Sequence, residues 1–382
     1  MGRKRDQGFS RIKVLRVMAR FNLGGPAQQI SSLMTHLDPK LFEQKLIVGF
    51  CAQDEIDYSE IRKLEFKVET NKYLGRKINL FSDLFALVSI VKTYYKFKPD
   101  VVHSHTAKAG VICRVARIFY FGKLSLVHTY HGHLLYGYFN RFQTQLVVIL
   151  EKILGLISSK LVAVGFRVKN ELVDAGIAKS EKIVVIPPGI CFLNIKDDSE
   201  VSSKSSQVLS IGFVGRITNI KRPDRFLNIV KKVQQFNLDV RFVVAGDGKL
   251  LDEMRQNSIN NNLGIEFLGW VANIDSLFQS LDVLILTSDN EGTPISIVQG
   301  AANSCIALST NVGSVEDVLL HEKTGFICDT DDEFAEKLKF LCENRLMLNT
   351  MKREARTFAI ENFSGTRLAR DHATIYNSII NS

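Results

Sequence analysis

The sequence has 382 residues, 46% of them hydrophobic and 23% charged, which is the balance of a folded chain and excludes an intrinsically disordered one. The net charge is +9, but residues 1–187 carry +14 and the remainder −5, so the first half either meets an anionic partner or presents a solvated basic surface. No apolar run is long enough to span a bilayer, and the basic start lacks the apolar core of a secretory signal.

Short β-type runs alternate with longer helical patterns in the first half of the chain, which predicts βαβ units and a parallel sheet. The predicted strands are 12–18, 45–49, 100–104, 124–129, 160–164 and 182–186. The predicted helices between them are 27–37, 80–97, 107–121 and 141–158.

The first predicted strand leads through a Gly-Gly turn into a helix, in the run VLRVMARFNLGGPAQQ at 14–29. Gly24 and Gly25 permit positive φ and let a ligand approach the backbone. The N-terminus of the following helix offers free N–H groups to an anion. A simple tight turn between strand and helix is the alternative interpretation.

Five of the eight histidines lie in two segments at predicted strand ends, HSHTAKAG at 103–110 and HTYHGH at 128–133. Loops after parallel strands carry functional residues disproportionately. We therefore expect functional residues in these segments, with His105, Lys108 and His133 among the candidates. The six cysteines form no CxxC pair and no HExxH run is present, so we expect reduced thiols and no metal site.

A polar, Ser-rich stretch at 197–207 is typical of a surface loop near a domain boundary. The alternation then restarts, which predicts an α/β fold with two doubly wound, Rossmann-like domains, 1–190 and 191–364, and a final segment 365–382 that packs back on the first domain. Ligands of such folds bind at the carboxyl ends of the strands, facing the gap between domains. The predicted strands of the second half are 208–215, 240–245, 265–268 and 283–287, and its predicted helices are 225–236, 250–257, 274–279, 294–303 and 365–380.

The run GFVGRITNIKRP at 212–223 places Gly215 directly after a strand, with Arg216 and Lys221 in the loop before the next helix. A diphosphate needs two cations and a close backbone. Arginine chelates two phosphate oxygens, and lysine supplies a mobile point charge. The loop therefore predicts a diphosphate site, with a basic surface loop as the alternative.

Two further glycine-rich strand ends follow, AGDG at 245–248 and FLGWV at 267–271. Such ends suit a nucleotide base and ribose in a doubly wound domain. Gly246, Trp270 and Val271 are therefore candidates for nucleotide binding, although Trp270 also fits a core or interface position.

The run SDNEGTPISIVQGA at 288–301 places Glu291 before Gly292, Thr293 and Pro294, and Pro294 is positioned to begin a helix. Glu291 can accept hydrogen bonds from sugar hydroxyls there, while the backbone N–H groups meet phosphate. The alternative is a carboxylate that only caps the helix.

Taken together, these segments resemble the family-4 retaining glycosyltransferases of the GT-B fold, from about residue 12 to the C-terminus. The resemblance implies an acceptor-side domain at 1–190 and a nucleotide-sugar domain at 191–364, facing a central cleft. It further implies that Gly24 and Gly25 lie against the donor phosphates and the acceptor, and that His131 lies near the reacting centre. The acceptor contacts that it suggests are His105, Lys108 and His133. It also implies that Arg216 and Lys221 neutralise the diphosphate, and that Glu291, the first acid of an E-x7-E motif, contacts the donor sugar.

Two positions depart from the family pattern. Gln299 stands where the second acid of the E-x7-E motif usually holds the ribose hydroxyls, and Ser314 stands in a VGS run where VGG is usual. Glutamine still accepts one hydrogen bond, but a neutral bond is worth about 0.5–1.5 kcal/mol against about 1.5–3 for a charged one. We expect donor binding to be about fivefold weaker, not abolished.

The implied activity is transfer of a sugar, with retained anomeric configuration, from a nucleotide-sugar donor, by first preference a UDP-linked hexose or N-acetylhexosamine. The expected acceptor is a saccharide or a lipid-linked acceptor in surface polysaccharide or glycolipid synthesis. Because Arg216, Lys221 and helix N-termini can stabilise the leaving diphosphate, we expect no metal cofactor.

The basic first half and the apolar-basic helix at 141–158 favour a cytoplasmic protein in peripheral contact with an anionic membrane surface. Nucleic acid is not an expected partner, because no basic run is interleaved with aromatics on a known module. Two alternatives stay open: a sugar-nucleotide epimerase or phosphorylase of similar fold, and a non-catalytic nucleotide-sugar-binding protein, which Gln299 suggests.

Overall fold

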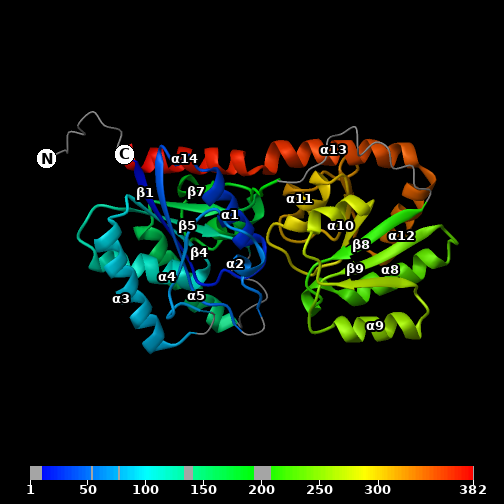
Figure 1. Cartoon of the computed structure of the whole chain (residues 1–382), viewed down its shortest axis with the longest axis horizontal. Coiled ribbons are helices and arrows are strands. Elements are labelled where there is room, and N and C mark those ends of the chain that lie inside the picture. Colours follow the sequence, from blue (N-terminus) through cyan, green and yellow to red (C-terminus); the bar gives the residue numbers. More distant parts are fainter. Residues whose placement is uncertain (1–10, 53–54, 76–77, 133–140, 193–207, 382) are drawn as a thin grey trace. The chain divides into compact units, whose positions relative to one another are not determined.

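The computed structural model describes residues 11–52, 55–75, 78–132, 141–192 and 208–381. The chain divides into two compact units: unit 1 comprises Met1–Cys191 with Gly365–Ser382, and unit 2 comprises Phe192–Ser364 (Figure 1). The expected boundaries, after residues 190 and 364, lie within one residue of these limits. Each unit has its own parallel sheet and its own hydrophobic core.

Unit 1 is built on a seven-stranded sheet in the order β3-β2-β1-β4-β5-β6-β7. The described strand pairs are parallel, so the carboxyl ends of the strands lie at one edge of the sheet. The sequence predicts all of these strands to within a few residues except β3, which is too short and too exposed to show a period of two. The strands are β1 (Ile12–Met18), β2 (Phe42–Val48), β3 (Val68–Thr70), β4 (Val101–His105), β5 (Ser125–Tyr130), β6 (Lys160–Ala163) and β7 (Ile183–Val185).

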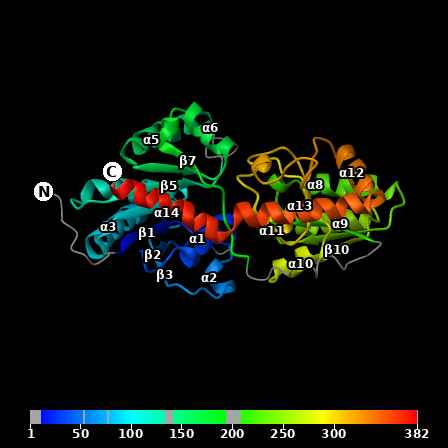
Figure 2. The same cartoon turned by 90° about the horizontal axis from the view of Figure 1, so that it is seen from above.

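The helices of unit 1 cover both faces of its sheet. α1 (Gly25–His36) and α14 (Gly365–Asn381) pack together on one face, over Val14, Val101 and Val127. Figure 2 views this face, with α14 lying across the strands. The opposite face carries α3 (Leu80–Phe97), α4 (Ala107–Ala116), α5 (Arg141–Ile157) and α6 (Phe166–Asp174).

Short helical elements complete unit 1. α2 (Tyr58–Ile61) follows β2, and the 3-10 helix η1 (Arg117–Phe119) continues α4. The sequence predicts one helix over 107–121, whereas α4 ends at Ala116 and the chain tightens into η1. A second 3-10 turn, η2 (Ser180–Lys182), leads into β7. Among the described residues, no helix has the length and hydropathy needed to cross a bilayer.

Unit 2 is built on a six-stranded parallel sheet in the order β10-β9-β8-β11-β12-β13. The predictions locate the first four strands in sequence but leave 304–364 unassigned. The last two strands, four and three residues long, are too short to show a period. The strands are β8 (Leu209–Val214), β9 (Val240–Ala245), β10 (Ile265–Gly269), β11 (Val283–Leu286), β12 (Ile306–Ser309) and β13 (Gly325–Ile327).

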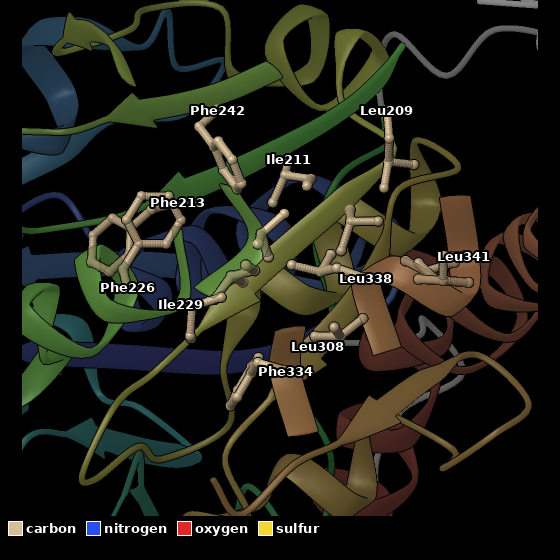
Figure 3. Close-up of a cluster of buried hydrophobic side chains, with 14 of the residues drawn as sticks. Leu209, Ile211, Phe213, Phe226, Ile229, Phe242, Leu308, Phe334, Leu338 and Leu341 are labelled. Carbon is tan, nitrogen blue, oxygen red and sulfur yellow. The ribbon is translucent and has the colours of Figure 1, made fainter. Parts of the chain in front are cut away.

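The core of unit 2 lies where β8 meets two helices. Leu209, Ile211 and Phe213 alternate along β8 and pack against α8 and α12 (Figure 3). The apolar spacing of α12, with Phe334 and Leu338 buried, is a signal that could have identified this helix from sequence. The elements of unit 2 are η3 (Asn219–Lys221), α8 (Pro223–Gln234), α9 (Leu251–Asn260), α10 (Ile274–Ser280), α11 (Ile295–Ala302), η4 (Val315–Asp317), α12 (Asp331–Glu343) and α13 (Arg345–Phe363).

Candidate active site

The glycine turn after β1 opens directly onto the N-terminus of α1. Gly24 is the residue before the helix and Gly25 is its first residue, and the helix has no side-chain cap and no acidic residue in its first turn. The positive φ that these glycines permit is not adopted, because Gly24 is extended (φ 161°) and Gly25 begins the helix. The glycines instead leave the first-turn N–H groups uncovered, which suits an anion or a close ligand.

The histidines at the ends of β4 and β5 form a column of rings in unit 1. His105 Nδ1 lies 3.0 Å from His131 Nε2, and the His105 ring lies 4.1 Å from that of His103. His103 in turn hydrogen-bonds Tyr376 and Thr129 at 2.6 and 2.7 Å. The C-terminal helix α14 thus fixes one ring of the column through Tyr376, a contact that the sequence did not predict.

Backbone strain marks the same place. Thr106, directly after His105, has a φ of 69°. A β-branched residue rarely adopts positive φ, and such outliers concentrate at functional sites. The Thr106 hydroxyl accepts a hydrogen bond from Ala19 N–H at 3.2 Å and so joins the end of β4 to the end of β1. α4 therefore begins, like α1, without a side-chain cap or an acidic residue in its first turn.

Burial keeps the imidazoles of the column neutral. It lowers the pKa of His131 from 6.5 to about 4 and that of His372, on α14, to about 3. Burial first, and neighbouring His and Arg charges second, hold the pKa of His103 and His105 well below 6.5. At neutral pH His131 is therefore an uncharged group that can exchange hydrogen bonds with a ligand, not a cation for a phosphate.

His128 and two predicted acceptor residues, Lys108 and His133, are not part of the described column. His128 points to the opposite face of the sheet, where it contacts Ser104 Oγ at 2.9 Å, because alternate residues of a strand face opposite sides. Lys108 is held in an ion pair with Asp83 at 2.5 Å, so its ammonium group already has a carboxylate partner. His133 lies outside the described residues.

In unit 2 the loop after β8 carries the two predicted cations in different states. Gly215 follows β8 with a φ of 151°, and a side chain at this position would meet open space. Arg216 is exposed and has no hydrogen-bond or ion-pair partner among the described residues. Lys221, at the end of η3, forms an ion pair with Glu291.

Glu291 is positioned by several elements of unit 2. It accepts hydrogen bonds from Lys221 Nζ and, at 2.6 Å, from Ser288 Oγ. Gly313, with a φ of 56°, lies so close that a Cβ there would be 1.9 Å from the Glu291 carbonyl oxygen. Ser314 N–H donates to the Gly292 carbonyl oxygen at 2.9 Å, so the loop after β12 supports the Glu291 loop. The Ser314 hydroxyl is buried and has no partner among the described residues.

The helix after Glu291 begins one residue later than predicted. Pro294 precedes α11, which starts at Ile295 without a side-chain cap or an acidic first-turn residue. The capping alternative for Glu291 is therefore wrong, since its carboxylate binds Lys221 and Ser288 instead. Thr293 lies with Gly292 in the partly buried loop before the helix.

Gln299 lies on α11 and is partly buried. Its backbone carbonyl oxygen accepts a hydrogen bond from the Asn303 side-chain amide at 2.9 Å. Its own amide group has no hydrogen-bond partner among the described residues. That amide is consequently available to a ligand.

The remaining predicted donor positions also lie at strand ends. Gly246 has a φ of 141°, and a Cβ there would be 1.9 Å from the Gly215 carbonyl oxygen, so only glycine fits. Trp270, with 43% of its surface exposed, follows β10, and Val271 is partly buried. The core interpretation of Trp270 is wrong, because nothing in unit 2 encloses it.

The sequence patterns did not identify several polar residues in and after the loops that follow β8 and β11. Arg222, which has a φ of 50°, binds the carboxylates of Asp224 and Asp289 and so ties η3 to the loop after β11. A pocket of about 280 Å³ beside it is lined mainly by α8 and α9 and holds none of the predicted donor residues. Across the described ranges, no group of three or more His, Cys, Asp and Glu side chains is arranged to hold a metal ion.

Two family matches span most of the chain. Residues 23–191 match Glycosyltransferase Family 4, and residues 194–358 match Glycosyl transferases group 1. The chain belongs to glycosyltransferase family 4. This glycosyltransferase is 27% identical over 377 residues to the UDP-Gal:alpha-D-GlcNAc-diphosphoundecaprenol alpha-1,3-galactosyltransferase of Escherichia coli, with 93% of this chain and 94% of that protein covered.

Other relatives agree. The glycosyltransferase is 24% identical over 338 residues to the capsular polysaccharide biosynthesis glycosyltransferase CapM of Staphylococcus aureus, covering 85% of this chain and 88% of the relative. Among solved structures, Anabaena HepE in complex with UDP matches with a TM-score of 0.77 and 19% identity, covering 96% of this chain and 100% of that one. The fold is accordingly GT-B, with two Rossmann-like units, as the sequence predicts.

Proposed function

We propose that this glycosyltransferase transfers a hexosyl or N-acetylhexosaminyl group from a UDP-sugar to a lipid-linked saccharide, with retention of anomeric configuration, in the synthesis of a surface polysaccharide or glycolipid. The names of its relatives support the donor and the acceptor. The Escherichia coli relative is named for UDP-Gal and a diphosphoundecaprenol-linked sugar, and the Anabaena structure holds UDP.

The observation that carries the proposal is the contrast between the two cations of unit 2. Arg216 is exposed and unpartnered among the described residues, whereas Lys221 is engaged by Glu291. An unpaired guanidinium at a strand end, next to Gly215, where the space beside the backbone is open, is suited to two oxygens of a diphosphate. The uncapped N-terminus of α11 adds N–H groups, whose partial positive charge also attracts phosphate.

In the proposed reaction the bond between the anomeric carbon and the diphosphate oxygen breaks, and UDP leaves. Arg216, Lys221 and the α11 N–H groups stabilise the developing negative charge. The acceptor oxygen bonds to the anomeric carbon on the face that UDP leaves, and its proton passes to the departing phosphate oxygen. This route uses the protein's own cations, so we propose that no metal cofactor takes part.

The remaining groups have proposed binding roles. Glu291, held by Lys221 and Ser288, presents its carboxylate to hydroxyls of the donor sugar, and the amide of Gln299 serves the ribose. His131 uses Nε2 toward His105, so Nδ1 is the ring nitrogen that can bind a hydroxyl near the reacting carbon. Gly24 and Gly25 leave the N-terminus of α1 open to the acceptor or the donor phosphates.

Turnover of UDP-, GDP- and ADP-sugars with a lipid-linked acceptor tests the proposal. We expect UDP release only with UDP-sugars, a product with the donor's anomeric configuration by NMR, and unchanged rates in EDTA. Arg216→Ala should lower kcat/KM about ten- to hundredfold, since a charge-assisted contact is worth about 1.5–3 kcal/mol. Arg353→Ala, an exposed arginine on α13, is the matched control and should behave as wild type.

Three results would contradict the proposal. Full activity of Arg216→Ala would remove the diphosphate contact, and an inverted product would remove retention. Formation of an epimerised nucleotide sugar without acceptor would identify a sugar-nucleotide epimerase instead. Activity lost in EDTA and restored by Mg²⁺ or Mn²⁺ would show that a metal ion, and not Arg216, stabilises the leaving diphosphate.

A further inference from the structure

The polarity of helix α5 is inverted. Its buried residues are Glu151, Leu154 and Gly155, and so include a carboxylate. Its exposed side is mainly apolar, with Gln143 and Gln145 exposed near its start and Lys152 as its one exposed charge among the residues described. A helix on a soluble surface normally shows the reverse pattern. The exposed apolar residues of α5 are Phe142, Leu146, Ile149, Leu150, Ile153, Leu156 and Ile157.

Helix α3 and the segment around η1 continue this pattern. The exposed stripe of α3 begins with Phe81, Leu84, Phe85 and Val88 and ends with basic residues. Ile118, Phe119 and Phe121 are exposed after α4, and the Phe119 carbonyl oxygen accepts a hydrogen bond from Tyr95 of α3 at 3.2 Å. Together, the exposed apolar residues of α3, of 118–121 and of α5 are called here the apolar face.

The apolar face belongs to one helical layer. α3, α4 and α5 lie on the side of the first sheet opposite α14, and α4 packs against both of its neighbours (Figure 1). Soluble monomers seldom expose contiguous apolar patches larger than a few hundred Å². A layer with this many exposed aliphatic and aromatic side chains therefore marks an interaction surface.

The exposed charges on α3 and α5 themselves, and at the residues that directly follow α3 and 118–121, are of one sign. They are Lys92, Lys96, Lys98, Lys123 and Lys152. The carboxylates of the same helices are already neutralised: Asp83 pairs with Lys108, and Glu151 pairs with Arg114. Apolar side chains that enter an interface, bordered by lysines that attract anionic headgroups, are the chemistry of a protein that lies on a membrane.

We propose that unit 1 docks on an anionic bilayer through the apolar face. The apolar side chains of α3, 118–121 and α5 insert among the lipids, and the lysines at the border of the face contact the headgroups. The inference deepens the proposed function, on which it rests for its purpose, because a lipid-linked acceptor is confined to the bilayer surface. It also changes the expected mechanism of attachment. Arg114 and Lys108, counted from the sequence among the basic residues, have partners within the fold, so insertion supplements electrostatic attraction.

Salt separates the two contributions. In about 1 M NaCl the Debye length is about 3 Å, which screens lysine–headgroup attraction but leaves apolar insertion intact. We expect the full chain to co-sediment with vesicles of phosphatidylethanolamine and phosphatidylglycerol, and a measurable part of this binding to survive high salt. Vesicles of zwitterionic lipid alone should bind the chain more weakly at low salt.

A pair of matched double variants tests the surface. Phe81→Gln with Leu156→Gln changes side chains that are 75% and 79% exposed on α3 and α5. Ile259→Gln with Leu346→Gln changes side chains that are 72% and 86% exposed in unit 2. The first variant should lower vesicle partitioning about tenfold at both salt concentrations, and the second should not. Lys92→Gln with Lys96→Gln and Lys98→Gln should lower it at low salt only.

Equal partitioning of both double variants would overturn the proposal, as would complete loss of wild-type binding in high salt. A wild-type dimer in lipid-free buffer that the Phe81→Gln, Leu156→Gln variant converts to a monomer, with vesicle binding unchanged, would assign the apolar face to a second copy. UDP release with a detergent-dispersed acceptor, measured on the same preparations, keeps the two proposals apart. Transfer without vesicle binding contradicts the docking alone, and vesicle binding without transfer contradicts the proposed function alone.

Discussion

At the scale of single residues, the environment of His131 determines what it can do. Its Nε2 meets His105 Nδ1, while the other nitrogen of His105 is buried without a partner among the described residues. The only side-chain hydrogen bond that the described residues give His105 is thus the one from Nδ1 to His131. We infer that His105 is a positioning residue, which fixes the ring orientation of His131 through that bond.

Two substitutions of His105 test this role. An asparagine amide lies close to the position of Nδ1, whereas phenylalanine keeps the ring and removes the hydrogen bond. We expect His105→Phe to lower kcat about a hundredfold through misplacement of His131, and His105→Asn to recover most of that loss. Thermal unfolding of both variants is the control. Equal activity of the two variants would show that the bond to His131 has no influence on turnover.

At the scale of secondary structure, one buried ion pair joins α4 to α5. Arg114 donates to both carboxylate oxygens of Glu151 at 2.9 and 3.0 Å, and Tyr130 donates to the same carboxylate at 2.6 Å. The two charged side chains are 1% and 2% exposed. Gly110 makes this packing possible, since a Cβ there would lie 2.5 Å from the His128 ring. The pair thus holds the Glu151 side of α5 inward and leaves the apolar side chains of its opposite side exposed.

Removing one charge of this pair should be costly. Glu151→Gln keeps an acceptor for Tyr130 but leaves Arg114 as an uncompensated buried cation, so we expect a loss of about 3–5 kcal/mol in the free energy of unfolding. Arg114→Met combined with Glu151→Gln removes the buried charge and should recover most of that loss. Urea unfolding of the three proteins measures the difference. If the double variant were less stable than the single one, the pair would be a net source of stability.

At the scale of the whole molecule, the buried histidines couple stability to pH. In the folded chain the pKa of His131 is about 4 and that of His372 about 3, against 6.5 in an unfolded chain. Between these values the unfolded chain binds more protons, so stability rises with pH. The stabilisation that depends on these neutral rings is therefore fully present above about pH 6.5, and it is lost as the pH falls toward 4.

We expect the Tm of the unfolding transition that includes unit 1 to fall steadily below about pH 6.5, because each unit of lowered pKa corresponds to about 1.4 kcal/mol. His372→Asn removes one such group and should reduce the slope of Tm against pH. His321→Asn, at an exposed position, is the matched control. A constant Tm between pH 7 and pH 4 would contradict neutral burial of these rings.

The sequence by itself determined the elements and the loops of the site. Alternating apolar runs identified most strands, because side chains of a strand face opposite sides in turn. Glycines and charged residues directly after those runs located the candidate residues at strand ends, since turn chemistry is local. Gly215, Arg216, Lys221 and Glu291 could all be named in this way. Short elements such as β3 and β13 carry too few residues for any period to be read.

Only the tertiary structure decided which of these residues meet. The Lys221–Glu291 pair joins residues 70 positions apart, and Tyr376 reaches His103 across 273 positions. Such pairs depend on strand order and on which helix covers which face, and neither is encoded in a local pattern. The same holds for α5, whose apolar spacing predicts a helix but not the side it exposes. The Arg114–Glu151 pair, formed between two helices, turns its apolar side outward.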